Sequence, residues 1–211
     1  MSVDPILKAK NIAFERNEKR LFAPVVLELF KGDALHIEGP NGSGKTTLFK
    51  LLAGILTPSQ GSIEYLGRPL AESRYDYLTN LMYIGHQSAV KSMLTVEENL
   101  RWLSPTGTST EEIKRALQKV GLQSHADVLC YQLSAGQQRR VALARLVTSK
   151  AKLWYLDEPF AALDKQGIHL VEMLMESHLQ GGGAVMFSSH QDLAKITARK
   201  YSIMSPGPLN D

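Results

Sequence analysis

One loop constrains the fold of this chain more than any other segment: Gly39-Pro-Asn-Gly-Ser-Gly-Lys-Thr46 fits G-x-x-x-x-G-K-[ST] at every fixed position. Glycines let backbone N–H groups curve around a polyphosphate, the lysine adds a positive charge at the phosphates, and the threonine hydroxyl can bind Mg2+. A short apolar run, Ala34–Glu38, precedes the loop, and a helical pattern follows it. Strand, glycine-rich loop and helix in this order predict a phosphate-binding site, and an incidental glycine turn is a poor alternative.

The segments around this loop are typical of alternating strands and helices. Leu7–Phe14 and Val25–Phe30 are short apolar runs separated by a charged segment at 15–20, which predicts two strands joined by a turn. After the loop, apolar residues at helical spacing predict an amphipathic helix that ends at Thr57-Pro58. The stripe consists of Leu48, Leu51, Leu52 and Ile55.

Helical patterns replace strand-like runs between about residues 88 and 145. Ser109 precedes Glu112 by three positions, as Ser134 precedes Gln137, and both pairs have the form of a capping box that begins a helix. A strand at 153–156, a helix at about 166–179 and a strand at 184–188 follow this region. The alternation predicts an α/β fold with a largely parallel sheet and an inserted helical subdomain.

Length and composition limit the other possibilities. The chain has 211 residues, 44% of them hydrophobic, which suits one globular domain over 1–211, with a core at 1–87 and 146–211 and the helical subdomain at about 88–145. No apolar run approaches the roughly 18–20 residues of a membrane-spanning helix. Cys130 is the single cysteine, so no internal disulfide can form, as expected in a reducing compartment. The chain has a net charge of +3 and no block of like charges that would indicate a nucleic-acid partner.

A second candidate for chemistry is Leu153-Trp-Tyr-Leu-Asp-Glu-Pro159, an apolar strand that ends in two carboxylates. The carboxyl ends of parallel strands meet at one edge of a sheet, so Asp157 can lie beside the phosphate loop and hold the water shell of a metal ion. Glu158 would then orient or deprotonate an attacking water. The alternative, a solvated acidic turn after a core strand, loses weight next to a phosphate loop.

Three further features have simple local explanations. The segment Leu133-Ser-Ala-Gly-Gln137 can be explained as a helix cap, His190 as a surface histidine after a strand, and Gln87 as an ordinary polar residue. A helix N-terminus also binds anions, but the sequence shows no partner near this one. None of the three indicates a function alone.

Together, these motifs resemble the nucleotide-binding subunit of ATP-binding-cassette (ABC) transporters, and the resemblance covers essentially the whole chain. The phosphate loop, Gln87, the signature 133–137, Asp157-Glu158, Ala162-Leu-Asp164 and His190 occur in the order of that family. The resemblance implies a P-loop NTPase (RecA-like) core with an antiparallel β subdomain and an inserted helical subdomain. It also implies a homodimer in which each ATP lies between the phosphate loop of one copy and the signature helix of the other.

Residue roles follow from the same resemblance, with ATP and Mg2+ as ligands. Glu158, His190 and Gln87 are expected to be catalytic. Thr46, Gln87 and Asp157 are expected at the metal, and Asp164 at the dimer interface. The phosphate loop expected to hold the nucleotide consists of Gly39, Pro40, Asn41, Gly42, Ser43, Gly44, Lys45, Thr46 and Thr47. The signature expected to reach the γ-phosphate in trans consists of Leu133, Ser134, Ala135, Gly136 and Gln137.

The chain departs from the family pattern at two places. Ala135 stands where glycine is usual, a small change that leaves the backbone donors intact. Near the position of the aromatic residue that stacks on adenine the sequence has Arg16, with Phe14 two residues earlier. Either a guanidinium plane or the Phe14 ring can stack on the base.

The particular residues within these motifs resemble one subfamily, the ATPase subunit of the bacterial cytochrome c maturation system or haem exporter. The shared features are Tyr83-Ile-Gly-His-Gln87, the Ser-Ala-Gly-Gln-Gln-Arg-Arg signature from Ser134, the short length and Arg16. The resemblance implies integral membrane partner subunits that dock on the helical subdomain, and ATP hydrolysis that drives release of a haem-loaded periplasmic chaperone. It places the chain peripherally at the cytoplasmic face of the bacterial inner membrane.

Two rival functions remain. An ABC transporter ATPase for another solute would share every catalytic residue and differ in the face that docks the membrane subunit. A non-transport ATP switch that clamps nucleic acid is disfavoured by the short insert and the lack of a coiled-coil arm, a tandem second cassette and a concentrated basic stripe. No haem ligand set is evident, because the histidines are scattered and Cys130 has no C-x-x-C-H context.

Overall fold

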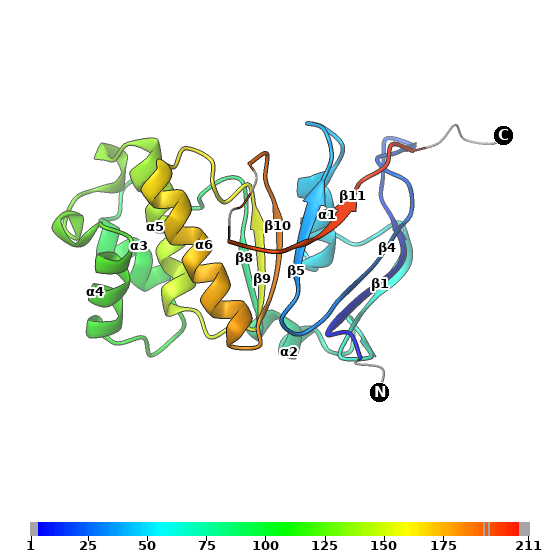
Figure 1. Cartoon of the computed structure of the whole chain (residues 1–211), viewed down its shortest axis with the longest axis horizontal. Helices are drawn as coiled ribbons and strands as arrows, with labels where there is room; N and C mark the ends of the chain where they lie inside the picture. Colours follow the sequence, from blue (N-terminus) through cyan, green and yellow to red (C-terminus); the bar gives the residue numbers. More distant parts are fainter. Residues whose placement is uncertain (1–3, 192, 194, 207–211) are drawn as a thin grey trace.

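Two β-sheets of different type form the frame of the molecule (Figure 1). The structure, a computed structural model, describes residues 4–191, 193 and 195–206. The antiparallel sheet has the strand order β4-β1-β6-β7 and consists of β1 (Leu7–Ala13), β4 (Val25–Leu29), β6 (Gln60–Tyr65) and β7 (Arg68–Pro69). The parallel sheet has the order β11-β5-β10-β9-β8 and consists of β5 (Ala34–Glu38), β8 (Leu81–Ile84), β9 (Leu153–Asp157), β10 (Ala184–Ser188) and β11 (Arg199–Ser202).

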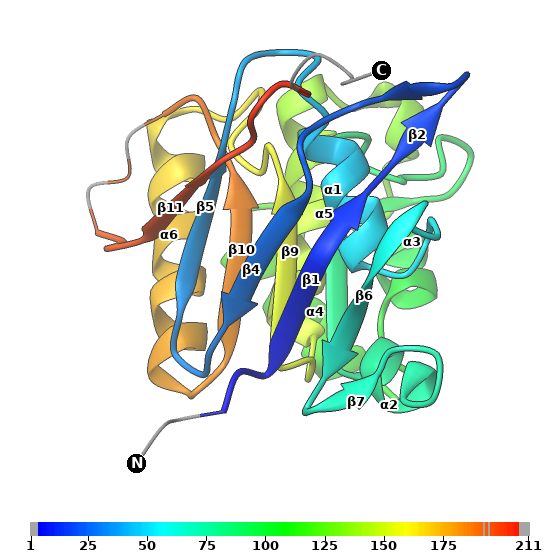
Figure 2. The same cartoon turned by 90° about the vertical axis from the view of Figure 1, so that its right-hand side faces the viewer.

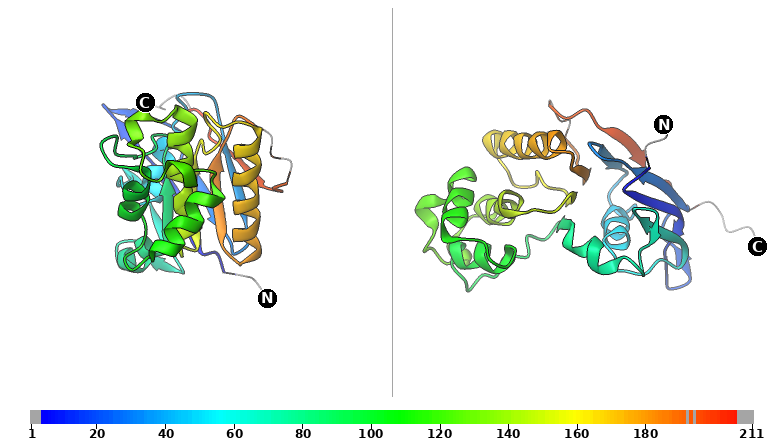
Figure 3. Two further views of the ribbon diagram at one scale, coloured as in Figure 1. Left: turned by 90° about the vertical axis from the view of Figure 1, so that its left-hand side faces the viewer. Right: turned by 90° about the horizontal axis from the view of Figure 1, so that it is seen from below.

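The helices fill the space between and beside the sheets. They are α1 (Lys45–Leu52), α2 (Arg74–Thr79), α3 (Val96–Leu103), α4 (Thr110–Lys119), α5 (Ala135–Thr148) and α6 (Lys165–Gln180), with short 3-10 turns at Gln123–His125 and Cys130–Gln132. Figure 2 shows α1 behind the antiparallel sheet, between it and the parallel strands. In Figure 3 the green helices α3–α5 gather at the end of the molecule away from the blue N-terminal strands. The predicted α/β fold with a parallel sheet is confirmed.

Strand β9 shows why the parallel sheet is stable in this position. Every residue of β9 is buried, and successive side chains point to opposite faces. Leu153 and Tyr155 join the hydrophobic cluster around α1, whereas Trp154 and Leu156 join the cluster formed with α5 and α6. Both faces are therefore covered, as a parallel sheet requires, and the strand reads as a continuous apolar run.

A third hydrophobic cluster packs α3, α4 and α5 against one another around Val96, Ile113 and Val141. The predicted capping boxes start two of these helices: Ser109 with Glu112 caps α4, and Ser134 with Gln137 caps α5. Each box satisfies N–H groups that have no partner within the helix.

The predicted helix after the phosphate loop is too long. Helix α1 ends at Leu52, and Ile55 lies outside it with 57% of its surface exposed. Gly54 has φ +68°, and its N–H donates to Leu51 O while the Ile55 N–H donates to Lys50 O. These are the two hydrogen bonds of a Schellman motif, which stops the helix before Thr57-Pro58.

The charged segment 15–20 turns as predicted. The two ends of this segment pair as a short hairpin of β2 (Glu15–Arg16) and β3 (Lys19–Arg20). Asn17 and Glu18 at its tip have φ values of +51° and +61°, which the right-handed twist of a tight hairpin favours. Within the part of the chain that the structure describes, no helix is long and apolar enough to cross a membrane.

Asn99 connects α3 to the segment that leads into it. Its side chain is fully buried, accepts a hydrogen bond from the Lys91 N–H and donates to the carbonyls of Lys91 and Thr95 at 2.9 and 3.0 Å. We expect Asn99→Ala to lower the free energy of unfolding by about 2–3 kcal/mol, because buried backbone groups lose their partner. Urea unfolding followed by circular dichroism measures this change. Thr79→Ala, on an exposed hydrogen-bonding side chain, is the control, with an expected effect within about 0.5 kcal/mol; an equally small effect at Asn99 would contradict the role of its network.

Candidate nucleotide-binding site

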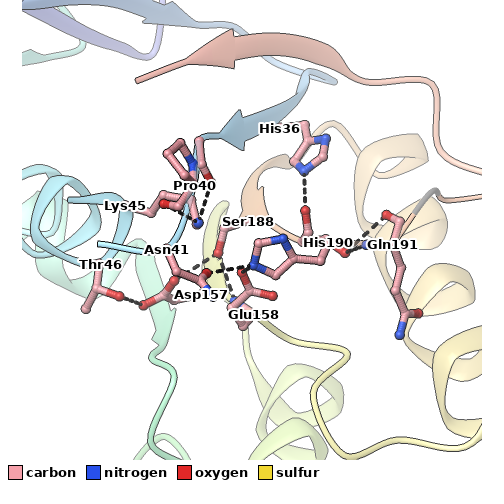
Figure 4. Close-up of polar contacts among 12 residues, drawn as sticks. His36, Pro40, Asn41, Lys45, Thr46, Asp157, Glu158, Ser188, His190 and Gln191 are labelled. Atoms are coloured by element: carbon pink, nitrogen blue, oxygen red, sulfur yellow. Dashed lines mark hydrogen bonds and ion pairs between the residues drawn. The ribbon is translucent and has the colours of Figure 1, made fainter. Parts of the chain in front are cut away.

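The parallel sheet brings three loops to one edge. Strand β10 lies between β5 and β9 and pairs with both in parallel. The loop that follows each strand therefore emerges at the same edge: the glycine-rich loop after β5, Glu158 after β9, and Ser189-His190 after β10. Figure 4 shows the side chains that meet there.

The glycine-rich loop depends on Gly44, which has φ +99° and stands as the N-cap of α1. A Cβ at Gly44 would lie 2.7 Å from Phe22 Cδ1, so only glycine fits the turn. Gly44 offers no side chain to cap the helix, and the first turn of α1 contains no acidic residue. The N–H groups of that turn are left to bind an anion at the positive end of the helix dipole.

Lys45 begins α1 and is 9% exposed. Its Nζ donates hydrogen bonds to Gly39 O at 2.7 Å and to Pro40 O at 3.3 Å, so the ammonium group lies inside the curve of the loop (Figure 4). An ammonium group in this position is a buried positive charge held by loop carbonyls, and it can equally donate to phosphate oxygens.

A chain of hydrogen bonds links the loop to the end of β9 and β10. Thr46 Oγ1 donates to Asp157 Oδ2 at 2.6 Å, and Ser188 Oγ donates to Asp157 Oδ1 at 2.9 Å. The N–H of Glu158 donates to Ser188 Oγ at 2.9 Å. Burial raises the pKa of Tyr83 to about 12, and the Asp157 carboxylate adds to that rise. The Asp157 carboxylate is thus fixed from two sides by hydroxyl groups.

Glu158 points its carboxylate toward the same cavity (Figure 4). Its Oε1 is buried and receives no hydrogen bond from any residue of the described chain, although it lies 3.4 Å from His190 Nε2. The same Nε2 lies 3.1 Å from Asn41 Oδ1. The φ of Glu158 is +51°, a left-handed conformation that a side chain other than glycine rarely adopts.

These groups surround a cavity of about 930 Å³. The expected site residues that line it are Phe14, Arg16, Pro40, Asn41, Gly42, Gly44, Lys45, Thr46, Thr47, Asp157, Glu158 and His190. Both candidates for the adenine contact, Phe14 and Arg16, thus face it. Gln87 is exposed and does not line the cavity, whereas its neighbour His86 does. The expected metal contact of Gln87 stays a prediction.

The signature 133–137 lies apart from this cavity. Leu133 is buried, whereas Ser134 and Ala135 are exposed at the N-terminus of α5. Ser134, Gly136 and Gln137 line a second cavity of about 590 Å³ together with 162–164. A Cβ at Gly136 would lie 2.7 Å from Ala162 O, so this close approach requires glycine.

Asp164 borders the second cavity and caps α6. Its Oδ1 accepts hydrogen bonds from the Gly167 N–H at 2.9 Å and from Arg140 Nη2 at 2.7 Å. These hydrogen bonds, that of the Gly167 N–H first, hold the pKa of the Asp164 carboxyl below its ordinary value. The carboxylate is nevertheless exposed, so it can meet a partner at this surface.

The donor set suits Mg2+ beside a polyphosphate. Within the described ranges, no group of three or more His, Cys, Asp or Glu side chains could hold a metal ion. Thr46 Oγ1 and Asp157 Oδ2 nevertheless lie side by side, and oxygen ligands of this kind bind Mg2+ when phosphates and waters supply the rest of the shell. The residues present fit that ion.

Sequence reasoning missed Ser188, which holds both Asp157 and the Glu158 amide. The signal was a hydroxyl at the end of the strand predicted at 184–188. Because parallel neighbours pair in register, Ser188 lies opposite Asp157. The sequence did not show that these two strands are neighbours.

Known proteins resemble this chain over most of its length. The pattern that defines the ABC transporter family matches residues 22–161. The chain is 46% identical over 196 residues to the cytochrome c biogenesis ATP-binding export protein CcmA of Pseudomonas fluorescens (strain Pf0-1), covering 92% of this chain and 93% of that protein. It is 40% identical over 200 residues to the Haemophilus influenzae protein of the same name, covering 93% and 94%.

Solved structures show the same architecture. The ATP-binding subunit of an ABC transporter superposes with a TM-score of 0.78 at 26% identity, covering 88% of this chain and 79% of that chain. An ATP-binding ABC transporter protein from Pyrococcus furiosus superposes with a TM-score of 0.80 at 26% identity, covering 93% and 96%. The predicted ABC ATPase fold is confirmed.

The position of Lys45 leads to a prediction about affinity. We expect Lys45→Ala to weaken ATP binding by about 10- to 100-fold, because one charge-assisted hydrogen-bond donor to the phosphates is lost. Equilibrium binding of a fluorescent ATP analogue measures the change. Lys31→Ala, on an exposed lysine outside the cavity, is the control and should bind like the unmodified chain; equal affinity in the two variants would remove Lys45 from the phosphate site.

Proposed function

The chain belongs to the ABC transporter family of ATP-binding, ATP-hydrolysing subunits, and from this premise we propose that it powers the haem-export step of cytochrome c biogenesis. The observation that carries the proposal is the 40–49% identity to proteins named for that process, over about nine tenths of both chains. The residues at 83–87 and the signature sequence from Ser134, which resemble that subfamily, support the same proposal.

ATP binding depends on the phosphate loop in this proposal. The N–H groups at the start of α1 and the Lys45 ammonium face the phosphates, because both lie on the inner side of the loop. The base lies toward Phe14 and Arg16, which line the same cavity. Either side chain stacks on adenine by its flat face.

Thr46 and Asp157 hold Mg2+ in the proposed site, directly or through its waters, with Gln87 as the further expected contact. When bound, the ion neutralises charge on the phosphate oxygens during transfer. The Thr46 hydroxyl, which donates to Asp157 at 2.6 Å, is the protein oxygen on the loop side. Ser188 keeps the Asp157 carboxylate turned toward it.

Glu158 is the proposed base for hydrolysis. Its carboxylate lines the cavity, and Oε1 is free to accept the proton of the water that attacks the γ-phosphate. His190 lines the same cavity, 3.4 Å from that oxygen and 3.1 Å from Asn41 Oδ1 in the loop, and would contact the γ-phosphate. The products are ADP and inorganic phosphate, with the water oxygen in the phosphate.

Hydrolysis requires a second copy of the chain in this proposal. The signature of one copy, with Ser134 and Ala135 exposed at the N-terminus of the 14-residue helix α5, would meet the ATP held by the phosphate loop of the other. The exposed Asp164 lies beside the signature and would cross the same interface. Two copies joined head to tail would enclose two nucleotides.

The export step also needs integral membrane subunits, which we propose dock on the helices α3–α5. The chain would then act peripherally at the cytoplasmic face of the inner membrane, and its hydrolysis cycle would drive release of the haem-loaded periplasmic chaperone. This proposal is supported by the names of the relatives, which are ATP-binding export proteins of cytochrome c biogenesis.

Separating binding from hydrolysis tests the role of Glu158. We expect Glu158→Gln to bind ATP normally and to lower turnover by at least about 100-fold, since an amide cannot accept the proton. ATP should then trap a dimer, which size-exclusion chromatography with light scattering detects. Glu111→Gln, on an exposed glutamate of α4, is the matched control with unchanged turnover. Hydrolysis near the normal rate in Glu158→Gln would show that another group is the base.

A genetic test addresses the transported substrate. We expect deletion of the gene to abolish haem attachment to c-type cytochromes, with recovery by the unmodified chain and not by Glu158→Gln. Peroxidase staining of membrane proteins for covalently bound haem measures the outcome. Normal haem attachment in the deletion strain, together with ATP hydrolysis by the purified unmodified chain, would assign the chain to a transporter of another solute.

A further inference from the structure

Arg139 is a buried cation to which the proposed mechanism gives no role. It lies on α5, two residues after the signature, and only 4% of its surface is exposed. Its guanidinium reaches two segments that are distant in sequence. It donates from Nη1 to Gly85 O (2.9 Å) and His86 O (3.4 Å), from Nη2 to Asp157 O (3.1 Å) and Glu158 O (2.7 Å), and from Nε to Pro159 O (3.2 Å).

The five N–H groups of the guanidinium thus meet five backbone carbonyls of the described chain. Burial lowers the pKa of Arg139, and the nearby Asp157 and Glu158 carboxylates act in the opposite direction. Burying a charge costs free energy unless the group is fully hydrogen-bonded. Here the partners are main-chain oxygens at the catalytic edge, the edge of the parallel sheet where the loops of the nucleotide site emerge. Arg145, on the same helix, differs because its Nε has no partner among the described residues.

One of the carbonyls that Arg139 holds belongs to Glu158, whose backbone is strained. Glu158 has φ +51°, a conformation that costs on the order of 1–3 kcal/mol and persists only where the surroundings fix it. Its N–H donates to Ser188 Oγ, and its carbonyl accepts the 2.7 Å hydrogen bond from Arg139. The peptide groups on both sides of its Cα are therefore held, by Ser188 on one side and Arg139 on the other.

We propose that Arg139 is the positioning residue that aims the Glu158 carboxylate at the nucleotide. By holding the Glu158 carbonyl, it keeps the left-handed backbone that directs the side chain into the cavity. The same guanidinium binds Gly85 and His86, directly before Gln87, so the direction of Glu158 depends on where that segment and α5 lie. This inference rests on the proposed role of Glu158 in hydrolysis.

Lysine cannot replace arginine in this position. An ammonium group donates from a single atom, whereas the planar fork of Arg139 spans the Gly85 and Glu158 carbonyls at once. Arg139→Lys keeps the charge and most of the buried stem but loses the bridge. Arg139→Gln removes the charge as well. If the residue positions Glu158, both variants lose turnover; if it only fills space, neither loses turnover per folded molecule.

The test measures turnover and binding on the same purified chain. The rate of ATP hydrolysis is expressed per nucleotide-binding site, counted with a fluorescent ATP analogue, so that unfolded molecules do not enter the result. We expect kcat to fall by about 10- to 100-fold in Arg139→Lys and Arg139→Gln, as for the loss of a group that orients a general base, while ATP affinity stays within about twofold. Arg145→Lys, on the same helix but with no partner for its Nε among the described residues, is the matched control and should keep the full kcat.

A second variant keeps the proposal testable if the Arg139 variants yield too few binding sites. Ser188→Ala leaves the guanidinium in place but removes the partner of the Glu158 N–H. Because Ser188 also donates to Asp157, we expect this variant to lower kcat whether or not ATP affinity changes. The proposal is overturned if Arg139→Lys keeps kcat within twofold, if the kcat and the ATP affinity of Arg139→Lys fall together, or if Ser188→Ala is fully active.

The outcome can be separated from a failure of the proposed function. If the unmodified chain does not hydrolyse ATP, the proposed hydrolysis itself fails. If the unmodified chain and Arg145→Lys hydrolyse ATP but Glu158→Gln does so too, Glu158 is not the base. Full activity of the Arg139 variants beside an inactive Glu158→Gln removes Arg139 from the positioning of that carboxylate while leaving the proposed function in place.

Discussion

The parallel pairing of β10 with β5 and with β9 is the constraint on which the site depends. Its register places Ser188 opposite both Ile37 and Asp157, so β9 and β10 end at one level and β5 ends one residue further along, at Glu38. Asp157 and Ser188 are therefore the last residues of hydrogen-bonded strands, and Glu158 and His190 follow them within two residues. A one-residue slip would turn Asp157 to the other face of the sheet and separate it from Thr46.

The sequence predicted those parts whose signal is local. The buried strands are apolar throughout because both faces are covered, and the capping boxes of α4 and α5 lie within four residues. The end of α1 was missed although Gly54 carried the signal. The contacts of Ser188 and Arg139 could not be predicted for another reason. Ser188 lies 30 residues from Glu158 and Arg139 lies 54 residues from Gly85, and nothing local shows which segments become neighbours.

Local preference and global fold disagree at the catalytic edge. Glu158 and Ala162 have φ values of +51° and +61°, although neither is glycine. The two residues bracket the short segment between the cavities: Ala161 lines the first cavity, and Ala162 O approaches Gly136 beside the second. Sequence rules fail at such sites because the surrounding contacts, not the residue's own preference, fix the backbone.

Lys45 and Arg139, both buried cations, differ in whether they can exchange their carbonyl partners for a ligand. Lys45 is held by two loop carbonyls through one mobile atom, so phosphate oxygens can replace those partners without moving the backbone. Arg139 is held by carbonyls from two segments through a rigid fork, so it cannot leave one partner without disturbing the others. The lysine therefore suits exchange with a ligand, whereas the arginine suits transmission, because any shift of Gly85 or α5 acts on the Glu158 peptide through it.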